Sequence, residues 1–132
     1  MEINRPDVVA EVQAAFDTYE AALMSNDLAG LDAAFWADPR TIRYGVNEVL
    51  HGIEEIQAFR VARPPTGLAR VLERTVITTY GQDAATASTL YHRTPGTLGR
   101  QMQTWVRMPD GWKVVAAHVS VINGEGHSAI RH

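Results

Sequence analysis

The segment Asp38–Gly45, DPRTIRYG, contains a residue whose chemistry suggests a binding site. The proline at position 39 disfavours α-helix in the residue before it, so a preceding helix should end by Asp38. Residues 41–44 then favour extended backbone, and Gly45 ends the strand. Because alternate residues of a strand face the same side, Arg43 shares its side with two small residues and has room around its guanidinium.

Two interpretations of Arg43 are open. Arginine is mostly exposed in folded proteins, so the side chain could point to solvent or pair with a carboxylate. Alternatively, Arg43 projects into a closed pocket and binds an anion there through two parallel hydrogen bonds. We adopt the second interpretation as our hypothesis, because other parts of the chain offer polar side chains for the same pocket.

A tyrosine in the first predicted helix is a second candidate. Apolar residues recur at three- and four-residue steps from Val8 to Leu23, which predicts an amphipathic helix from about Pro6 to Met24. Tyr19 lies on the apolar side of this helix, so its ring should be buried, and a buried phenol needs a hydrogen-bond partner. The hydroxyl either bonds to a backbone carbonyl in the core or faces a cavity as a donor.

Two more helices are expected on either side of the strand that contains Arg43. The second is short and ends before Asp38, and the third begins after Gly52, which follows a short extended piece at residues 47–51. Arg60 and Arg63 share one side of the third helix. Such long side chains commonly extend to solvent, but one of the two could reach the cavity of Arg43.

Beyond residue 67 the hydrophobic pattern alternates, which predicts strands instead of helices. Consecutive strands with short turns form an antiparallel meander. The segment Pro109–Gly111 is a strong signal for the last hairpin. The expected strands are residues 70–80, 85–93, 99–108 and 113–122.

The final strand is apolar on both sides. Val115, Ala117 and Val119 would share one side, whereas His118 and Ser120 would lie in the middle of the other. A strand buried on both sides needs cover on both. Helices can cover one side and the sheet of a second copy the other, so we predict a homodimer through the sheet face.

The preceding strand brings two glutamines and a tryptophan to one side. Gln101, Gln103 and Trp105 alternate along it. Amide groups and an indole N–H suit a cavity that holds a polar ligand. A solvent-exposed face is the alternative, and Gln101 is the residue that fits it best.

Composition narrows the class of protein. The 132 residues suit one domain, with 45% hydrophobic and 20% charged residues. A net charge of −3 gives no footprint for nucleic acid, and the absence of cysteine excludes thiol chemistry. We expect no metal, no cofactor and no membrane span. The N-terminus lacks the pattern of a secretory signal, so a cytoplasmic location is the default, and residues 125–132 are expected to form a flexible tail.

Helices followed by a curved antiparallel sheet of four to six strands predict an α+β fold, a cone-shaped barrel closed by the first helix. This order resembles the nuclear transport factor 2-like superfamily, whose fold is also called cystatin-like. SnoaL-like proteins and ketosteroid isomerase are members. The superfamily carries many functions, so the architecture alone assigns none.

Seven segments together resemble one family more closely than any of them does alone. They are INRPDVVAEV, FWADPRTIRYG, GIEEIQAFRVARP, RTVITTYG, ATAST, GRQMQTWVRM and GWKVVAAHVS. These segments are similar to the AtzH-like family, which includes the oxalurate-catabolism protein HpxZ. The resemblance extends over nearly the whole chain and implies a single domain over residues 1–124.

The resemblance implies a role in the breakdown of nitrogenous compounds such as cyanuric acid and ureides, with a functional link to an amidase-signature hydrolase. It implies a metal-independent, decarboxylating amidohydrolase that acts on a carboxylated urea, 1,3-dicarboxyurea. The family is thought to need a tyrosine on the first helix and an arginine on the first strand, which match Tyr19 and Arg43. His118 is a second acid–base candidate. The expected substrate contacts are Arg60, Gln103, Trp105, His118 and Ser120.

Two other functions stay open. A ketosteroid-type isomerase also uses a first-helix tyrosine, but it needs an aspartate base and an apolar cavity. Asp38 looks like part of a turn, and an arginine in the cavity argues against a steroid. The other possibility is a non-catalytic dimeric module that serves a partner amidase.

Overall fold

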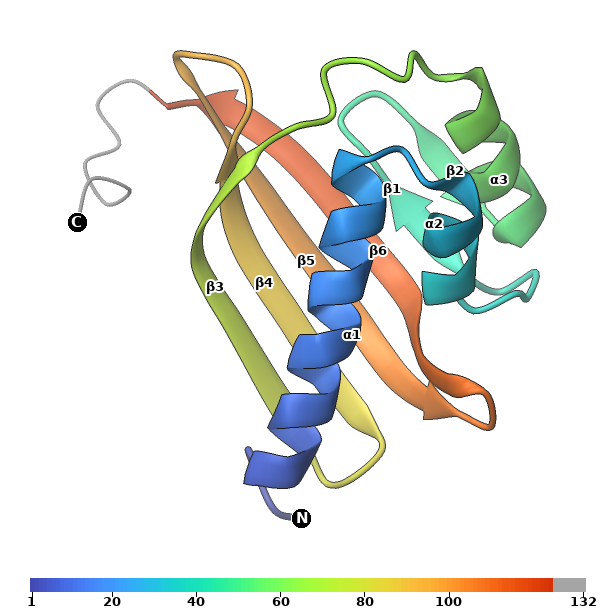
Figure 1. Ribbon diagram of the computed structural model, residues 1–132, viewed down its shortest axis with the longest axis vertical. Coiled ribbons are helices and arrows are strands. Elements are labelled where there is room, and N and C mark those ends of the chain that lie inside the picture. The colour runs from blue at the N-terminus through green and yellow to red at the C-terminus, as the bar shows by residue number, and fades with distance from the viewer. Residues whose placement is uncertain (125–132) are drawn as a thin grey trace.

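The computed structural model describes residues 1–124, and the predicted flexible tail lies outside the described residues. Helices α1 and α2 lead into the short strands β1 and β2, and α3 connects these to four long strands (Figure 1). The elements are α1 (Pro6–Met24), α2 (Leu28–Ala34), β1 (Ile42–Tyr44), β2 (Val49–His51), α3 (Ile53–Ala62), β3 (Val71–Tyr80), β4 (Ala84–His92), β5 (Thr97–Met108) and β6 (Gly111–Asn123).

The six strands form one sheet with the order β2-β1-β6-β5-β4-β3. Strands β3 to β6 form the predicted antiparallel meander. However, β1 pairs with β6 in parallel, so the expectation of a wholly antiparallel sheet is wrong at this pair. No hairpin joins β1 to β6, and antiparallel pairing is therefore not imposed on them.

The helices begin where local chemistry favours them. Pro6 occupies the first turn of α1, where its missing N–H costs no hydrogen bond, and Asp7 complements the helix dipole. Asp27 caps α2, because its Oδ1 accepts a hydrogen bond of 3.1 Å from the backbone N–H of Gly30. One side of α1 is buried, and it includes Phe16 and Tyr19.

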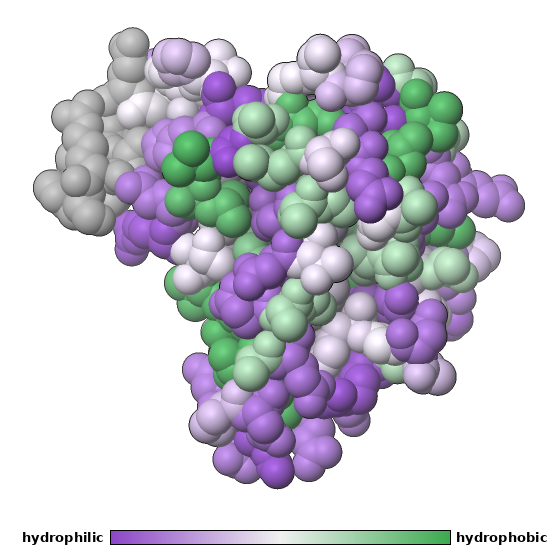
Figure 2. Space-filling model, in the orientation of Figure 1, coloured by the Kyte–Doolittle hydropathy of each residue, from purple (hydrophilic) through white to green (hydrophobic). Residues whose placement is uncertain are grey.

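The core lies between α1 and the inner face of the sheet, and α1 lies across β4 to β6 in Figure 1. Trp105 of β5 is fully buried at its centre, together with Phe16, Phe35 and Ile56 from the helical side. Figure 2 shows that hydrophilic residues gather at the narrow lower end, beside the N-terminal half of α1. The wider end holds β1, β2, α3 and the C-terminal end of α1.

A β-bulge in β6 changes which residues face the core. Thr104 pairs with Ala116, but Trp105 pairs with Val114, so Val115 is an extra residue. The predicted alternation is therefore wrong at this point. Val114, and not Val115, shares the inner side with Ala117, because the bulge shifts the alternation by one residue.

The opposite, outer face of the sheet exposes several large apolar side chains. Met102 is 60% exposed between two buried glutamines, and Val76 and Tyr44 are also exposed. A groove of about 290 Å³ runs over this face, lined by residues that include Tyr44, Met102 and His118. None of the helices in residues 1–124 is both long and apolar enough to cross a bilayer.

Candidate anion-binding site

Arg43 is the central residue of β1, and its side chain lies on the helix side of the sheet. Its neighbour on β6 is Ala117, a small buried residue that leaves space for a guanidinium. The Arg43 side chain is 13% exposed, and its Cζ lies 5.2 Å from the ring centre of Phe59 on α3. The side of the strand predicted for Arg43 is confirmed.

The Arg43 guanidinium already forms an ion pair with a carboxylate of the same chain. The Nη1 atom of Arg43 donates a hydrogen bond of 2.7 Å to Oε1 of Glu48, in the loop between β1 and β2. Gly45 makes this contact possible, since a Cβ there would lie 1.7 Å from that Oε1 and 3.0 Å from Nη1 of Arg43. The site can therefore hold a carboxylate in bonding geometry.

Tyr19 faces the same interior from α1. Its ring lies 6.0 Å from that of Phe35, and the residue is 5% exposed, as predicted for the apolar side of the helix. The predicted partner for the hydroxyl is not found, because no group within residues 1–124 forms a hydrogen bond with it. The phenol is therefore available to a ligand as a donor.

Arg60 lies next to Tyr19, but its guanidinium is already paired with a carboxylate of the same chain. Its side chain is 3% exposed, and Nη1 donates to Oδ1 of Asp32 over 3.2 Å. The Cζ atom also lies 4.3 Å from the ring centre of Phe35. Burial lowers the pKa of Arg60, with Tyr19 opposing and Arg43 adding to this effect, so these charges lie within electrostatic reach of one another.

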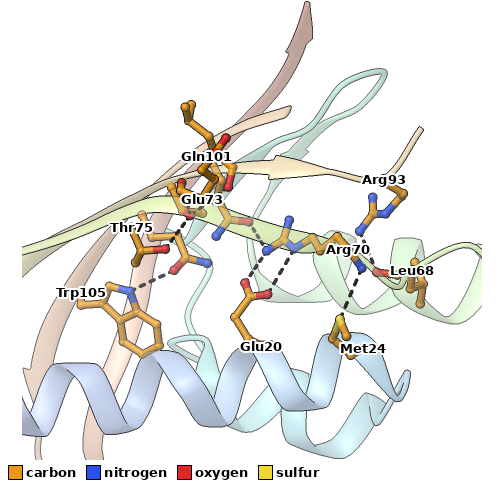
Figure 3. A network of polar contacts seen from close by, with 12 residues as sticks. Glu20, Met24, Leu68, Arg70, Glu73, Thr75, Arg93, Gln101 and Trp105 are labelled. Carbon is orange, nitrogen blue, oxygen red and sulfur yellow. Dashed lines mark hydrogen bonds and ion pairs between the residues drawn. The ribbon is translucent and has the colours of Figure 1, made fainter. Parts of the chain in front are cut away.

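A second buried ion pair holds α1 to the sheet (Figure 3). Arg70 donates through Nη2 to Oε1 of Glu20 and through Nε to Oε2 over 3.2 Å. The same Nη2 donates over 3.0 Å to Oε1 of Gln101. Gln101 is 2% exposed, so the alternative interpretation that placed it on a solvent-exposed face is wrong. The Arg70 guanidinium lies 4.6 Å from the ring centre of Tyr91.

Replacement of Glu20 should measure how strongly this pair stabilises the fold. We expect Glu20→Gln to lower the free energy of unfolding by about 2–3 kcal/mol, because the buried Arg70 loses its counter-charge but keeps an amide acceptor. Thermal unfolding followed by circular dichroism should show a Tm lower by about 8–12 °C. Asp17→Asn removes an exposed carboxylate of the same helix and should leave the Tm nearly unchanged. An equal loss in both variants would contradict a special role for the buried pair.

The arginine and carboxylate side chains around this end of the interior have a net positive charge, which is a surplus of guanidiniums over carboxylates. Arg43, Arg60, Arg63 and Arg70 are buried or half-buried there, and the exposed Arg93 lies at the edge. Three carboxylates pair with three of these five arginines, so five minus three leaves two positive charges, one of them on the exposed Arg93. The two guanidiniums of this group that no carboxylate pairs are those of Arg63 and Arg93. Burial lowers the pKa of both groups, but Arg93 is an exposed residue whereas Arg63 is half-buried. A small dianion would balance this surplus.

The two core residues of β5 that were predicted to contact substrate form a hydrogen bond with each other. Trp105 is fully buried, and its Nε1–H donates to Oε1 of Gln103 over 3.1 Å. Gln103 is 2% exposed. The structure places both on the inner face, as predicted, but the indole N–H is already used within the core.

His118 and Ser120 do not lie with Arg43. His118 is exposed on the outer face, where its ring lies 6.2 Å from that of Tyr44. Ser120 accepts a hydrogen bond of 3.1 Å from Nε of Arg100, which is also exposed. The prediction that both residues line the inner pocket is therefore wrong, because after the bulge these positions alternate with the buried Ala117 and Val119.

Five cavities of about 280–430 Å³ lie on the outer sheet face, beside α3 and between α1 and α2, and neither Tyr19 nor Arg43 lines any of these five. The ion pairs of Arg43, Arg60 and Arg70 occupy part of the interior. The predicted closed pocket is therefore not one of these cavities, and Glu48 must leave Arg43 before a ligand carboxylate can take its place.

A family model shows the family of the chain, and solved structures show what it is similar to. The AtzH-like family model matches residues 1–125. The chain belongs to the AtzH-like family. Among curated proteins, no match was found. Two solved structures are similar to this AtzH-like chain over nearly its full length. A DUF3225-family protein of unknown function from Pectobacterium atrosepticum is 60% identical, with a TM-score of 0.90, and 92% of this chain and 95% of that chain are covered.

The other is a cystatin-like fold protein from Burkholderia xenovorans. It is 55% identical, with a TM-score of 0.89, and 93% of this chain and 98% of that chain are covered. A nuclear transport factor 2-like protein from Salmonella enterica is 24% identical, with a TM-score of 0.74 and coverage of 91% and 94%, and shows the shared fold. The AtzH-like chain therefore has the predicted α+β cone fold of that superfamily.

The chemistry available to this AtzH-like site is acid–base and electrostatic. Within residues 1–124, no three His, Cys, Asp or Glu side chains lie where they could hold a metal ion. The interior offers a phenol donor in Tyr19 and a guanidinium in Arg43 that binds carboxylate. Sequence reasoning missed Glu48, although its charge is opposite to that of Arg43 and it lies five residues away, on the next predicted extended segment.

Proposed function

We propose that this AtzH-like protein is a small decarboxylating amidohydrolase that removes CO2 from a carboxylated urea such as 1,3-dicarboxyurea, or from a related ureide of oxalurate breakdown. In this proposal Arg43 binds a carboxylate of the substrate and Tyr19 donates a proton. The observation that carries it is the carboxylate of Glu48 on the guanidinium of Arg43, near two guanidiniums without a carboxylate partner, the half-buried Arg63 and the exposed Arg93.

The proposed step needs anchoring and one proton. The bond between the urea nitrogen and its carboxylate carbon breaks, the electron pair stays on the nitrogen, and the carboxylate leaves as CO2. The nitrogen takes the proton of the Tyr19 hydroxyl, and water later returns a proton to the phenol. Loss of one CO2 converts 1,3-dicarboxyurea into allophanate. A positioned general acid contributes about 10²–10⁴-fold to such a step.

Turnover of the candidate substrate tests the proposal. Freshly prepared ¹³C-labelled 1,3-dicarboxyurea is mixed with the protein, and ¹³C NMR follows the appearance of CO2 and allophanate. We expect formation at a rate well above that of the spontaneous reaction in buffer. A rate equal to the spontaneous one, with the protein folded, would overturn the proposal.

A non-catalytic module that serves an amidase remains the second candidate. The observation in its favour is that carboxylates of the chain itself pair with Arg43, Arg60 and Arg70, as in a protein that binds no small anion there. Co-purification of an amidase without turnover would support it. A ketosteroid-type isomerase is disfavoured, because Arg43, Arg60 and Arg70 all place charge in the interior where a steroid needs apolar walls.

A homodimer through the outer sheet face is part of the same proposal. Exposed apolar side chains on that face, including Met102 and Val76, would be covered by a second copy. Light scattering after gel filtration should give twice the chain mass of 14.5 kDa. Met102→Glu should give the monomer mass, because two like charges would meet at the interface. Val61→Glu, at an exposed position on α3, is the control and should remain dimeric.

A further inference from the structure

Arg63, the residue after α3, carries donors that nothing in residues 1–124 satisfies. Its Nε and Nη2 atoms are sealed from water and have no hydrogen-bond partner. A buried charged donor without an acceptor lowers stability, and native proteins satisfy most such groups. A ligand or ion that supplies the missing acceptor is one explanation of such a group.

The chain places Arg63 against the same aromatic ring as Arg43. The Cζ atoms of Arg43 and Arg63 lie 5.2 Å and 5.9 Å, respectively, from the ring centre of Phe59. Pro64 disfavours α-helix at Arg63, whose backbone is extended with φ −74° and ψ 150°. The backbone therefore turns away from the helix axis at Arg63, where α3 ends.

The charged surroundings of Arg63 link it to the proposed site. Burial lowers the pKa of Arg63, and the positive charges of Arg43 and Arg93 add to this effect. Tyr19 and Glu48 oppose it. Both proposed functional residues, together with the carboxylate that occupies Arg43, thus lie within electrostatic reach of the unsatisfied guanidinium.

Arg60, Arg70 and the exposed Arg93 have partners for their side chains. Arg60 is paired with Asp32, and Arg70 is paired with Glu20. Arg93 donates through Nη2 to the backbone oxygen of Leu68 over 3.0 Å, as Figure 3 shows. Among Arg43, Arg60, Arg63, Arg70 and Arg93, sealed and unpartnered nitrogens are found on Arg63.

We propose that Arg63 is a second anion anchor, so that the site selects compact molecules with two carboxylates. One carboxylate displaces Glu48 from Arg43, and the other accepts hydrogen bonds from Nε and Nη2 of Arg63. This inference rests on the proposed function and deepens it, because it assigns the second carboxylate of the substrate to a residue. A monocarboxylate would leave the Arg63 donors unsatisfied.

Calorimetric titration with two matched ligands tests the inference. Malonate has two carboxylates, and malonamate has the same carbon skeleton with one carboxylate replaced by an amide. We expect the wild-type protein to prefer malonate. Arg63→Gln should weaken malonate binding by about 10- to 100-fold and change malonamate binding less than about two-fold. Arg63→Lys keeps the positive charge but lacks the planar guanidinium, so its affinity for malonate should lie between those of the wild type and Arg63→Gln.

Two further variants serve as controls. Arg43→Gln should weaken the binding of both ligands, because each uses the first carboxylate site. Arg5→Gln removes an arginine at the opposite end of α1, where it pairs with Asp7, and should change neither affinity. Equal weakening of both ligands in Arg63→Gln, no weakening at all, or a wild-type protein that binds no malonate would each overturn the inference.

Thermal unfolding gives a second readout that a merely structural Arg63 would not produce. Because the sealed donors lack acceptors, Arg63→Gln should raise the Tm of the ligand-free protein by about 2–5 °C. A lower Tm would show that the side chain stabilises the fold and would count against the anchor. These binding and stability results do not depend on turnover, so failure of the decarboxylation assay alone would remove the proposed function and leave the anion anchor standing.

Discussion

Replacement of Arg43 by glutamine should lower kcat/KM for 1,3-dicarboxyurea by about a thousand-fold or more. The guanidinium binds the substrate carboxylate through charge-assisted hydrogen bonds inside a region from which water is largely excluded. Glutamine keeps part of the volume but offers a single neutral amide. The loss corresponds to about 4 kcal/mol of transition-state stabilisation. Steady-state kinetics by ¹³C NMR measures it.

Two companion variants separate anchoring from structure. Arg40→Gln removes a neighbouring arginine whose side chain is 76% exposed, and it should keep wild-type kinetics. Glu48→Gln removes the internal carboxylate that competes for Arg43, so KM should fall or stay the same. If Arg43 only held Glu48 in place, Glu48→Gln would lose as much activity as Arg43→Gln, and the anchoring role would be wrong.

Residues within one strand or helix were predictable because their direction follows from local periodicity. Alternation along β1 placed Arg43 and Thr41 on the inner side and Tyr44 on the outer, as the structure has them. The helical repeat of α1 placed Tyr19 in the core in the same way. The resemblance to a family supplied the cone fold. Neither source specified which side chains meet.

The failures have identifiable physical causes. The bulge at Val115 breaks the alternation of β6, and residues 114–117 are all small or apolar, so they give no signal of an extra residue. His118 and Ser120 were assigned to the inner pocket, although they alternate with the buried side of the strand.

The interior ion pairs were also missed. Glu20 and Arg70 are 50 residues apart, and only the folded sheet brings them together. Pairs of this kind depend on the packing of α1 over the sheet, and that packing is decided by many apolar contacts at once. Sequence patterns therefore identify the charged residues of such a site one at a time. Which of them form ion pairs with one another can be seen only in the folded structure.

Tyr19→Phe should lower kcat by about a thousand-fold while KM changes little. Phenylalanine keeps the ring that packs against Phe35 at 6.0 Å, so the fold and the arginines around it should be preserved. What disappears is the hydroxyl, which no group in residues 1–124 bonds. Its removal therefore leaves no buried partner unsatisfied, and the Tm should stay within about 2 °C of the wild-type value.

Tyr44→Phe is the matched control, because it removes the hydroxyl of an exposed tyrosine on the outer face. It should keep wild-type turnover. A Tyr19→Phe variant that retains full kcat would assign the proton to water or to another group and leave Arg43 as the catalytic anchor. A variant with raised KM and unchanged kcat would make the phenol a binding contact. Only a loss in kcat alone fits a donor that acts when the carbon–nitrogen bond breaks, because that interaction strengthens in the transition state.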